Sequence, residues 1–529
     1  MNTATRSRRT RLLHGARRVV AAAALFAAAG PASADSLQTL KGVPVPLPPN
    51  LGTFVKDRTA AIQLGKALFW DAQTGGTGAQ ACATCHFQAG ADTRTRNTVN
   101  PGANRVFNSV AGADAFIVPG IFPINTGDVV GSQGLIKMSF NAITGGAVDN
   151  CTVLADPIFN VNGNNVRQVT GRNTPTNINA IFNFRNFWDG RANNIFNGVN
   201  PAGPNDPTAT VLQVGPNGPV AVTVSIPNAS LASQAVGPPN NGVEMSCAGR
   251  NFPQLARKLL NLRPLGDQFV SPDDSVLGPL ANPSGTGLTT TYAALIQAAF
   301  QPQWWNSGAL VNGFSVMENN FSLYWGLSIL LYESKLVPDD TRVDRFLSGN
   351  SSAISATEQL GMDVFTGKGR CVQCHNGPEL TSATVRNGDP RKGFFNSAVR
   401  PVAEDTGDIV GGNAMFKTPG IRNTELNGPY FHNGGMATLR EVVEFYNRGG
   451  DFPSQFTDGQ IRPLGLTETE KTALVAFIVA LTDDRVRFEK GPFDHPSLEV
   501  PNGPSVPAVG KLGRNPGVAP FLNLSPFQP

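Results

Sequence analysis

Apolar residues recur at helical spacing in several separate parts of the chain. In residues 59–70, Leu64 and Leu68 fall four positions apart and predict one apolar face of a helix. Residues 250–335 combine further helical runs with four large aromatic residues, Trp304, Trp305, Tyr324 and Trp325. This part of the chain is therefore expected to be helical.

Capping boxes mark three helix starts in the second half of the chain. In such a box a Ser or Thr caps the helix, and a Glu three positions later bonds back to the cap. Ser355 and Glu358 predict a helix that presents Leu360 and Val364 on one face. The other two boxes predict amphipathic helices and consist of Thr438 with Glu441 and Thr467 with Glu470.

The remaining stretches lack helical periodicity. Residues 35–58 are rich in proline and expected to be extended, and the Pro-rich residues 491–529 are expected to wrap the surface. Residues 91–171 are rich in Asn, Gly and Thr and are interpreted as an insertion. A second insertion, near 192–229, contains alternating apolar positions at 220–226 that predict a small β hairpin. The expected fold is mainly α with long Gly/Pro-rich loops.

The first 34 residues predict a signal peptide. Six arginines precede and flank an apolar stretch, Val19–Ala29, and the small residues Ala32-Ser33-Ala34 follow. This order is typical of secretion signals cleaved after the small residues, here near Ala34, and predicts export to the periplasm. The apolar stretch is too short to span a bilayer and no later stretch is long enough, so no membrane span is expected.

The formal charge of +4 depends on that leader. Without its six arginines the 42 basic residues become 36, against 38 acidic residues. The charge therefore gives no reason to expect a nucleic-acid partner.

Two copies of the pattern Cys-x-x-Cys-His carry the candidate chemistry. In this pattern the two thiols add to the vinyl groups of one haem and the histidine binds its iron. A zinc knuckle would need further Cys or His nearby, and a thioredoxin-like pair does not require the histidine. We therefore expect two covalent c-type haems, attached through Cys82, Cys85 and His86 and through Cys371, Cys374 and His375.

Cys151 and Cys247 are left over after haem attachment, since the chain has six cysteines. In an oxidising compartment they could form a disulfide. Their spacing does not show whether they meet.

Several short stretches accompany the haem motifs: Leu64-Gly65-Lys66-Ala67-Leu68-Phe69-Trp70-Asp71, Arg172-Asn173-Thr174-Pro175-Thr176-Asn177, Phe187-Trp188-Asp189-Gly190-Arg191-Ala192, and the segments 416–423 and 428–435. Together they resemble the bacterial di-haem cytochrome c peroxidases and their MauG-type relatives. The resemblance implies two cytochrome c-like haem domains. The peroxidatic one would span 35–335 and the electron-transfer one 336–490, with the tail at 491–529.

The resemblance also implies that the first haem is open to peroxide. Resting di-haem peroxidases use a distal histidine between the two motifs, and no histidine lies between His86 and His375 here. Met138 or Met245 could still bind this iron.

The family places four residues around the peroxidatic haem, and this chain has matching positions. Glu244 would be the general acid–base, because cleavage of the O–O bond needs a group that moves a proton. Gln234 would orient the oxidant, and Pro238 would crowd the distal face. Trp188 would lie between the haems as an electron relay.

At the second haem, Tyr446 occupies the position where peroxidases have methionine and MauG-type enzymes have tyrosine. A phenolate ligand stabilises ferric iron. The alternatives are that Tyr446 is a core residue and that Met436 is the ligand. His432 is expected to be a buried hydrogen-bonding residue near this haem, and His495 a turn residue.

The family binds calcium between its domains through oxygen atoms, which suit a hard cation. Asn173, Asn427 and Pro429 match those positions, although Asn427 replaces the family's threonine. A backbone ligand tolerates that change.

The resemblance makes periplasmic reduction of hydrogen peroxide the leading function, with a small cytochrome c or cupredoxin as electron donor and a monomer or homodimer as the assembly. A MauG-type enzyme that oxidises a protein or organic substrate is the first alternative, favoured by Tyr446 and the missing histidine. A rubber-oxygenase-like dioxygenase is another, against which Gln234 and Glu244 argue. A plain electron carrier would conflict with an open first haem.

Overall fold

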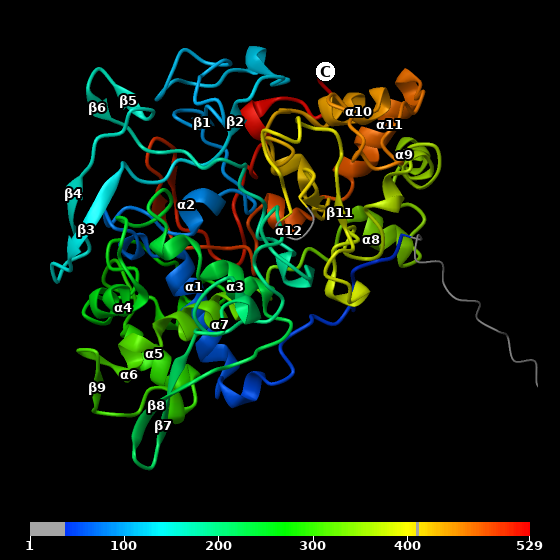
Figure 1. Cartoon of the computed structure of the whole chain (residues 1–529). Coiled ribbons are helices and arrows are strands. Elements are labelled where there is room, and N and C mark those ends of the chain that lie inside the picture. Colours follow the sequence, from blue (N-terminus) through cyan, green and yellow to red (C-terminus); the bar gives the residue numbers. More distant parts are fainter. Residues whose placement is uncertain (1–36, 409–411) are drawn as a thin grey trace, which may run out of the picture. The chain divides into compact units, whose positions relative to one another are not determined.

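Twelve α-helices lie in residues 37–408 and 412–529, the part of the chain that this computed structural model describes (Figure 1). The predicted signal peptide lies outside the described residues. The helices are α1 (Arg58–Trp70), α2 (Ala83–His86), α3 (Ser230–Ala235), α4 (Phe252–Leu260), α5 (Tyr292–Ala299), α6 (Val316–Asn319), α7 (Phe321–Glu333), α8 (Arg342–Leu347), α9 (Ala356–Thr366), α10 (Leu439–Arg448), α11 (Glu468–Val479) and α12 (Asp484–Arg487).

Short strands pair into seven two-stranded antiparallel ribbons within the same residues. They are β1 (Val99–Asn100) with β2 (Val129–Val130), β3 (Met138–Ala142) with β4 (Asn150–Val153), β5 (Asn160–Val161) with β6 (Asn164–Asn165), β7 (Val211–Gly215) with β8 (Gly218–Val222), β9 (Leu310–Val311) with β10 (Phe314–Ser315), β11 (Phe394–Phe395) with β12 (Phe416–Lys417), and β13 (Leu498–Glu499) with β14 (Ser505–Val506). The fold is therefore a mixture of helices and small hairpins, less purely helical than expected.

Helix α1 forms as its pattern predicts. The carboxylate of Asp57 caps it by accepting the N–H groups of Thr59 and Ala60. Leu64 and Leu68 are fully buried. The helix packs against α7 so closely that a Cβ at Gly65 would lie 1.9 Å from the carbonyl oxygen of Ser328. Glycine at this position therefore lets the two backbones meet.

The three predicted capping boxes are present at the starts of α9, α10 and α11. The predicted face of α9 is wrong in one respect, because Leu360 is 39% exposed while Val364 is buried. The contact with α11 runs through Gly361, where a Cβ would lie 1.9 Å from the carbonyl oxygen of Ala473. This close approach turns Leu360 toward solvent.

The predicted hairpin exists, but it is shifted toward the N-terminus. Strands β7 and β8 pair from Val211 with Val222 to Gly215 with Gly218. Ile226 instead forms a bridge with Phe196 and is fully buried. The hairpin ends early because Ile226 contributes to the core.

The C-terminal tail does more than wrap the surface. Leu498 and Val500 lie in the largest apolar core of the described residues. The ammonium group of Lys66 on α1 lies 2.8 Å from Asp274 and 3.1 Å from Asp494, and all three side chains are fully buried. His495 is not a turn residue, since it is buried and stacks on Trp70 with ring centroids 4.6 Å apart. The tail is thus part of the packed structure.

A second apolar core gathers residues between Val343 and Leu481, including inward side chains of α9, α10 and α11. The second haem motif contributes to it through Val372 and Cys371. No helix in the described part of the chain has the length and apolar character needed to cross a membrane.

Candidate haem and peroxide site

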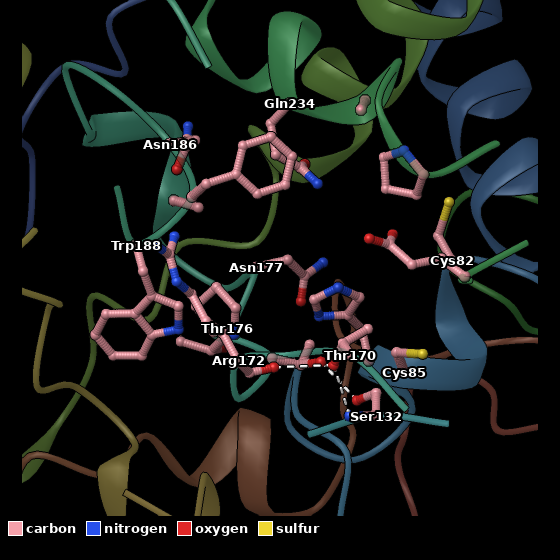
Figure 2. Close-up of a pocket in the computed structure, with 18 of the residues that line it drawn as sticks. Cys82, Cys85, Ser132, Thr170, Arg172, Thr176, Asn177, Asn186, Trp188 and Gln234 are labelled. Carbon is pink, nitrogen blue, oxygen red and sulfur yellow. Dashed lines mark hydrogen bonds between the residues drawn. The ribbon is translucent and has the colours of Figure 1, made fainter. Parts of the chain in front are cut away.

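A large cavity lies at the first haem motif. It has a volume of about 520 Å³ and is lined by Cys82, Cys85 and His86. Figure 2 shows the two cysteines on one side of this cavity and Trp188 on the opposite side, with Gln234 above. This size falls within the range of small-molecule and cofactor sites, which is about 300–1,000 Å³.

The imidazole of His86 is oriented for a ligand. Its Nδ1 lies 2.9 Å from the carbonyl oxygen of Gly90, which leaves Nε2 for the cavity. Gly90 has φ +79°, and a Cβ there would lie 2.5 Å from Oγ1 of Thr176. Burial lowers the pKa of His86, which favours the neutral ring that binds metals.

Three residues that the resemblance assigned to the distal side line this cavity, namely Glu244, Gln234 and Pro238. Burial raises the pKa of Glu244, and the nearby charge of Arg191 opposes that rise. The side-chain oxygen of Asn241 accepts the backbone N–H of Glu244 at 3.2 Å and so shapes the turn. The cavity wall therefore contains a carboxyl group able to exchange a proton.

The two candidate methionines are placed differently. Met245 is buried and lines the cavity. Met138 lies on β3 and packs in a separate apolar cluster with Leu135 and Cys247. Among the described residues that line the cavity, His86 is the sole histidine.

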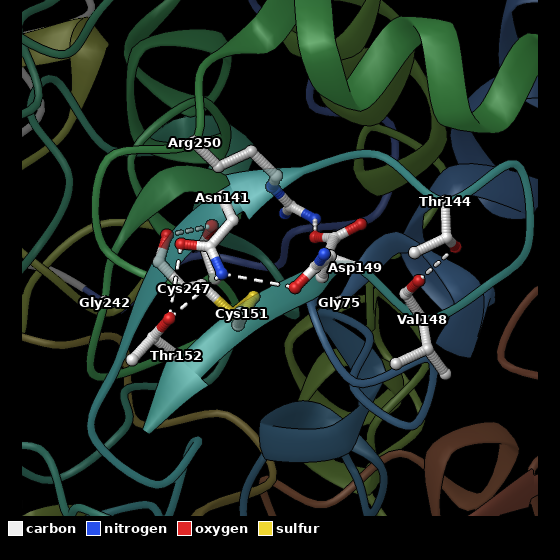
Figure 3. Close-up of a disulfide and its surroundings, with 12 residues drawn as sticks. Gly75, Asn141, Thr144, Val148, Asp149, Cys151, Thr152, Gly242, Cys247 and Arg250 are labelled. Atoms are coloured by element: carbon white, nitrogen blue, oxygen red, sulfur yellow. Dashed lines mark hydrogen bonds and ion pairs between the residues drawn. A yellow bond between two sulfur atoms is a disulfide. The ribbon is translucent and has the colours of Figure 1, made fainter. Parts of the chain in front are cut away.

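A disulfide between Cys151 on β4 and Cys247 joins the first insertion to the loop that carries Glu244 (Figure 3). Beside it, Asp149 contacts Arg250 at 2.7 Å and Lys258 at 3.0 Å, and all three side chains are fully buried. The guanidinium of Arg250 also donates to the carbonyl of Pro239 at 2.6 Å. The insertion thus anchors both ends of this loop.

Sequence reasoning missed Glu333 in this cavity. It ends α7, is 2% exposed and lines the cavity together with Asn177, whose amide donates to its Oε1 at 3.2 Å. Its Oε2 has no partner among the described residues. Burial raises the pKa of Glu333 to about 8. No sequence signal marks it, because a glutamate at a helix end is usually exposed.

Trp188 lies between two cavities, since it lines the large one and also a smaller one of about 100 Å³. Its indole N–H donates to the carbonyl of Asn173 at 2.8 Å, and its own carbonyl accepts the backbone N–H of Lys417 at 2.8 Å. The ring meets His432 edge-on with centroids 6.4 Å apart. These contacts hold the indole in one orientation.

The second haem motif follows α9. Nδ1 of His375 lies 3.1 Å from the carbonyl oxygen of Pro419 and 3.3 Å from that of Leu380, which leaves its Nε2 for iron. Cys371 and Cys374 carry free, half-buried thiols, as Cys82 and Cys85 do.

Tyr446 lies on α10, a helix whose Leu439 and Val443 share an apolar core with Cys371. Burial raises the pKa of its phenol, and Cys374 and Cys371 would raise it further if they were ionised. Met436 is buried nearby in a cluster with Val399. Met436 thus packs in the cluster that Tyr446 adjoins, and of the two candidates only Tyr446 is close enough to the thiols for their ionisation to affect it.

His432 is buried, as expected. Its ring stacks on Phe416 with centroids 3.6 Å apart, and its Nε2 has no partner among the described residues. Burial lowers its pKa to about 3.

The candidate calcium ligands Asn173, Asn427 and Pro429 all line the smaller cavity. The amide of Asn173 contacts the carbonyl of Pro429 at 2.6 Å, and Oδ1 of Asn427 is buried without a partner in the described chain. Within that same part, no group of three or more His, Cys, Asp or Glu side chains could hold a metal. The lining offers neutral oxygens only.

Both motifs fit a covalent haem. Each combines two free thiols with an imidazole whose Nδ1 is engaged by a carbonyl. At the first motif the adjoining cavity supplies the space.

Comparison with known proteins agrees with the fit of both motifs to haem. Residues 59–352 match the profile of the di-haem cytochrome c peroxidase family. The chain is 37% identical to cytochrome-c peroxidase IdrP1 of Denitromonas iodatirespirans over 29% of this chain and 48% of that protein. It is 30% identical to cytochrome c551 peroxidase of Nitrosomonas europaea over 45% of this chain and 67% of that protein. It thus spans about half the length of IdrP1.

A solved structure of a MauG-like protein associated with microbial copper homeostasis is similar over 87% of this chain and 97% of that chain, with 19% identity and a TM-score of 0.48. The diheme peroxidase BthA from Burkholderia thailandensis is similar over 85% and 91%, with 18% identity and a TM-score of 0.45. The family profile covers more than half of the chain. The protein therefore belongs to the di-haem cytochrome c peroxidase family, an oxidoreductase family that carries two c-type haems.

Proposed function

We propose that this protein reduces hydrogen peroxide in the periplasm at the haem attached to Cys82 and Cys85. The observation that carries the proposal is that Glu244 and Gln234 line the same cavity as those thiols and His86. Bound haem would supply the redox-active iron. Glu244 would take a proton from one peroxide oxygen and return it to the other, while Gln234 orients the peroxide and Pro238 limits the space.

Electrons would enter through the second haem and pass Trp188. The position of Trp188 supports this route, because the residue lines both cavities, its indole N–H donates to the carbonyl of Asn173, and its main-chain carbonyl accepts the N–H of Lys417. A small cytochrome c or cupredoxin would be the donor. We also propose that residues 35–335 form the peroxidatic domain and that residues 336–490 form the electron-transfer domain.

Turnover of the purified holoprotein tests this function. Hydrogen peroxide with a reduced small c-type cytochrome is compared with dioxygen and a polyisoprene substrate. We expect rapid, peroxide-dependent oxidation of the cytochrome and no polymer cleavage. Polymer cleavage without cytochrome oxidation would contradict the proposal and favour an oxygenase. If the protein catalyses neither reaction, the proposal is also contradicted and an electron carrier is favoured.

A MauG-type oxidation of a protein or organic substrate is the second candidate. The nearness of Tyr446 to the second pair of thiols favours it, because a phenolate ligand would stabilise oxidised iron there.

Replacing Tyr446 with Phe distinguishes a ligand from a core residue. If the phenolate binds iron, the variant should change the ferric spectrum of the second haem and raise its reduction potential. Met436→Leu is the matched variant in the same cluster and should change neither. Electron paramagnetic resonance and a redox titration give both readouts, and an effect of Met436→Leu alone would make methionine the ligand.

We also propose that the smaller cavity binds calcium through Asn173, Asn427 and Pro429. The buried, unpartnered Oδ1 of Asn427 supports this proposal. Because the lining has no carboxylate among the described residues, the negative charge would have to come from another group.

A further inference from the structure

Lys417 on β12 is a buried cation without a counter-charge. Lys417 is only 5% exposed. Burial is the one influence on the pKa of its ammonium, and no hydrogen bond or charge of a described residue acts on it. The three other buried lysines do have partners. Lys66 contacts Asp274 and Asp494, Lys258 contacts Asp149, and Lys471 contacts Glu444 and Glu468. A buried charge without a partner destabilises the fold, so Lys417 calls for a counter-charge.

The cavity around Lys417 contains nothing that could neutralise it. Lys417 lines the smaller cavity with Trp188 and Asn173, and its described lining contains no Asp or Glu. The other charged lining residue is Arg422, which is already paired with Asp344 at 2.6 Å. The missing partner is therefore an anion that does not come from the side chains lining this cavity.

The smaller cavity adjoins the large one at the edge away from the thiols. Asn173, Thr174, Thr176 and Trp188 line both cavities. Cys82 and Cys85 lie on the opposite side from Trp188 (Figure 2). A haem has its vinyl groups on one edge and its two carboxylates on the opposite edge. A haem joined to those cysteines would thus direct its carboxylates toward Trp188 and Lys417.

We infer that Lys417 is the counter-ion of a carboxylate of the haem attached to Cys82 and Cys85. The inference rests on the haem content of the family and is independent of peroxide reduction. Burial lowers the pKa of Lys417 to about 8, so the ammonium is mainly protonated at neutral pH even before a carboxylate reinforces it. A haem carboxylate would also bring negative charge to the cavity proposed for calcium.

This pairing has a consequence for the haem itself. A positive charge near a haem favours its reduced state, because reduction adds one negative charge. Lys417 therefore raises the reduction potential of the first haem. Its removal should lower that potential.

The test is a redox titration of both haems in three holoprotein variants. Lys417→Met should weaken reduction of the first haem by about tenfold or more, which corresponds to 59 mV for a one-electron couple. Lys417→Arg keeps the charge and should restore the potential. Lys368→Met removes a surface lysine paired with Glu470 and should leave both potentials unchanged.

Haem content and the ferric spectrum show whether each variant has folded. If Lys417→Met does not take up haem, Lys417→Gln keeps a polar group of similar reach and is compared with Lys417→Arg in the same way. Unchanged potentials in a folded, charge-free variant would overturn the inference, and so would a shift confined to the second haem.

Discussion

Replacing Glu244 with Gln is expected to slow peroxide-dependent turnover by about 100-fold or more, the usual contribution of a general acid–base. The amide is nearly isosteric with the carboxyl group but cannot accept and return the proton. Steady-state oxidation of a reduced cytochrome measures the rate. Haem content and the ferric spectrum should stay unchanged, because Glu244 holds neither haem.

Glu499→Gln is the matched control, since it makes the same substitution at an exposed position on β13. The pH profile gives a second readout. Peroxide must give its proton to ionised Glu244, so turnover should rise with pH through a pKa that burial raises above its ordinary value. This rising limb should disappear in Glu244→Gln. A rate and profile like those of the unchanged protein would remove Glu244 from the mechanism.

Replacing both Cys82 and Cys85 with Ser should abolish peroxide reduction. Serine does not add to the vinyl groups, so covalent haem should fall from two per chain to one, as measured by a pyridine haemochrome assay. Rapid mixing with peroxide should then give no spectral change, because the cavity with Glu244 and Gln234 belongs to this motif.

The matched variant replaces Cys371 and Cys374 with Ser. It should also retain one haem, but that haem should still react with peroxide in a single mixing experiment. Steady turnover with a reduced cytochrome should be lost, since the proposed route brings electrons in through the second haem. The opposite pattern, a reaction only where Cys371 and Cys374 are intact, would show that the roles of the two haems are reversed.

Features that depend on neighbouring residues were predictable. The haem motifs need particular residue types at fixed spacing, and the capping boxes at Ser355, Thr438 and Thr467 depend on bonds within one turn. The burial of Leu64 and Leu68 on α1 followed from the helical period, although every residue of 64–70 is buried and not one face alone. The resemblance added Glu244, Gln234 and Pro238, and all three line the same cavity.

Features that depend on distant residues were not predictable from the sequence. Leu360 is exposed because a glycine of α9 approaches α11, and the tail is buried because Lys66 binds Asp494 across the sequence. The pairing of Cys151 with Cys247 likewise depends on how the first insertion folds back. None of these contacts leaves a local pattern.

The sequence by itself determined that the chain has two haem-attachment motifs and where α9, α10 and α11 begin, because thioether formation and helix capping involve residues a few positions apart. Only the tertiary structure decided which side chains share a cavity. It placed Glu333 in the haem cavity and left Lys417 buried without a carboxylate, since burial and partnership of a charge depend on segments brought together from distant parts of the chain.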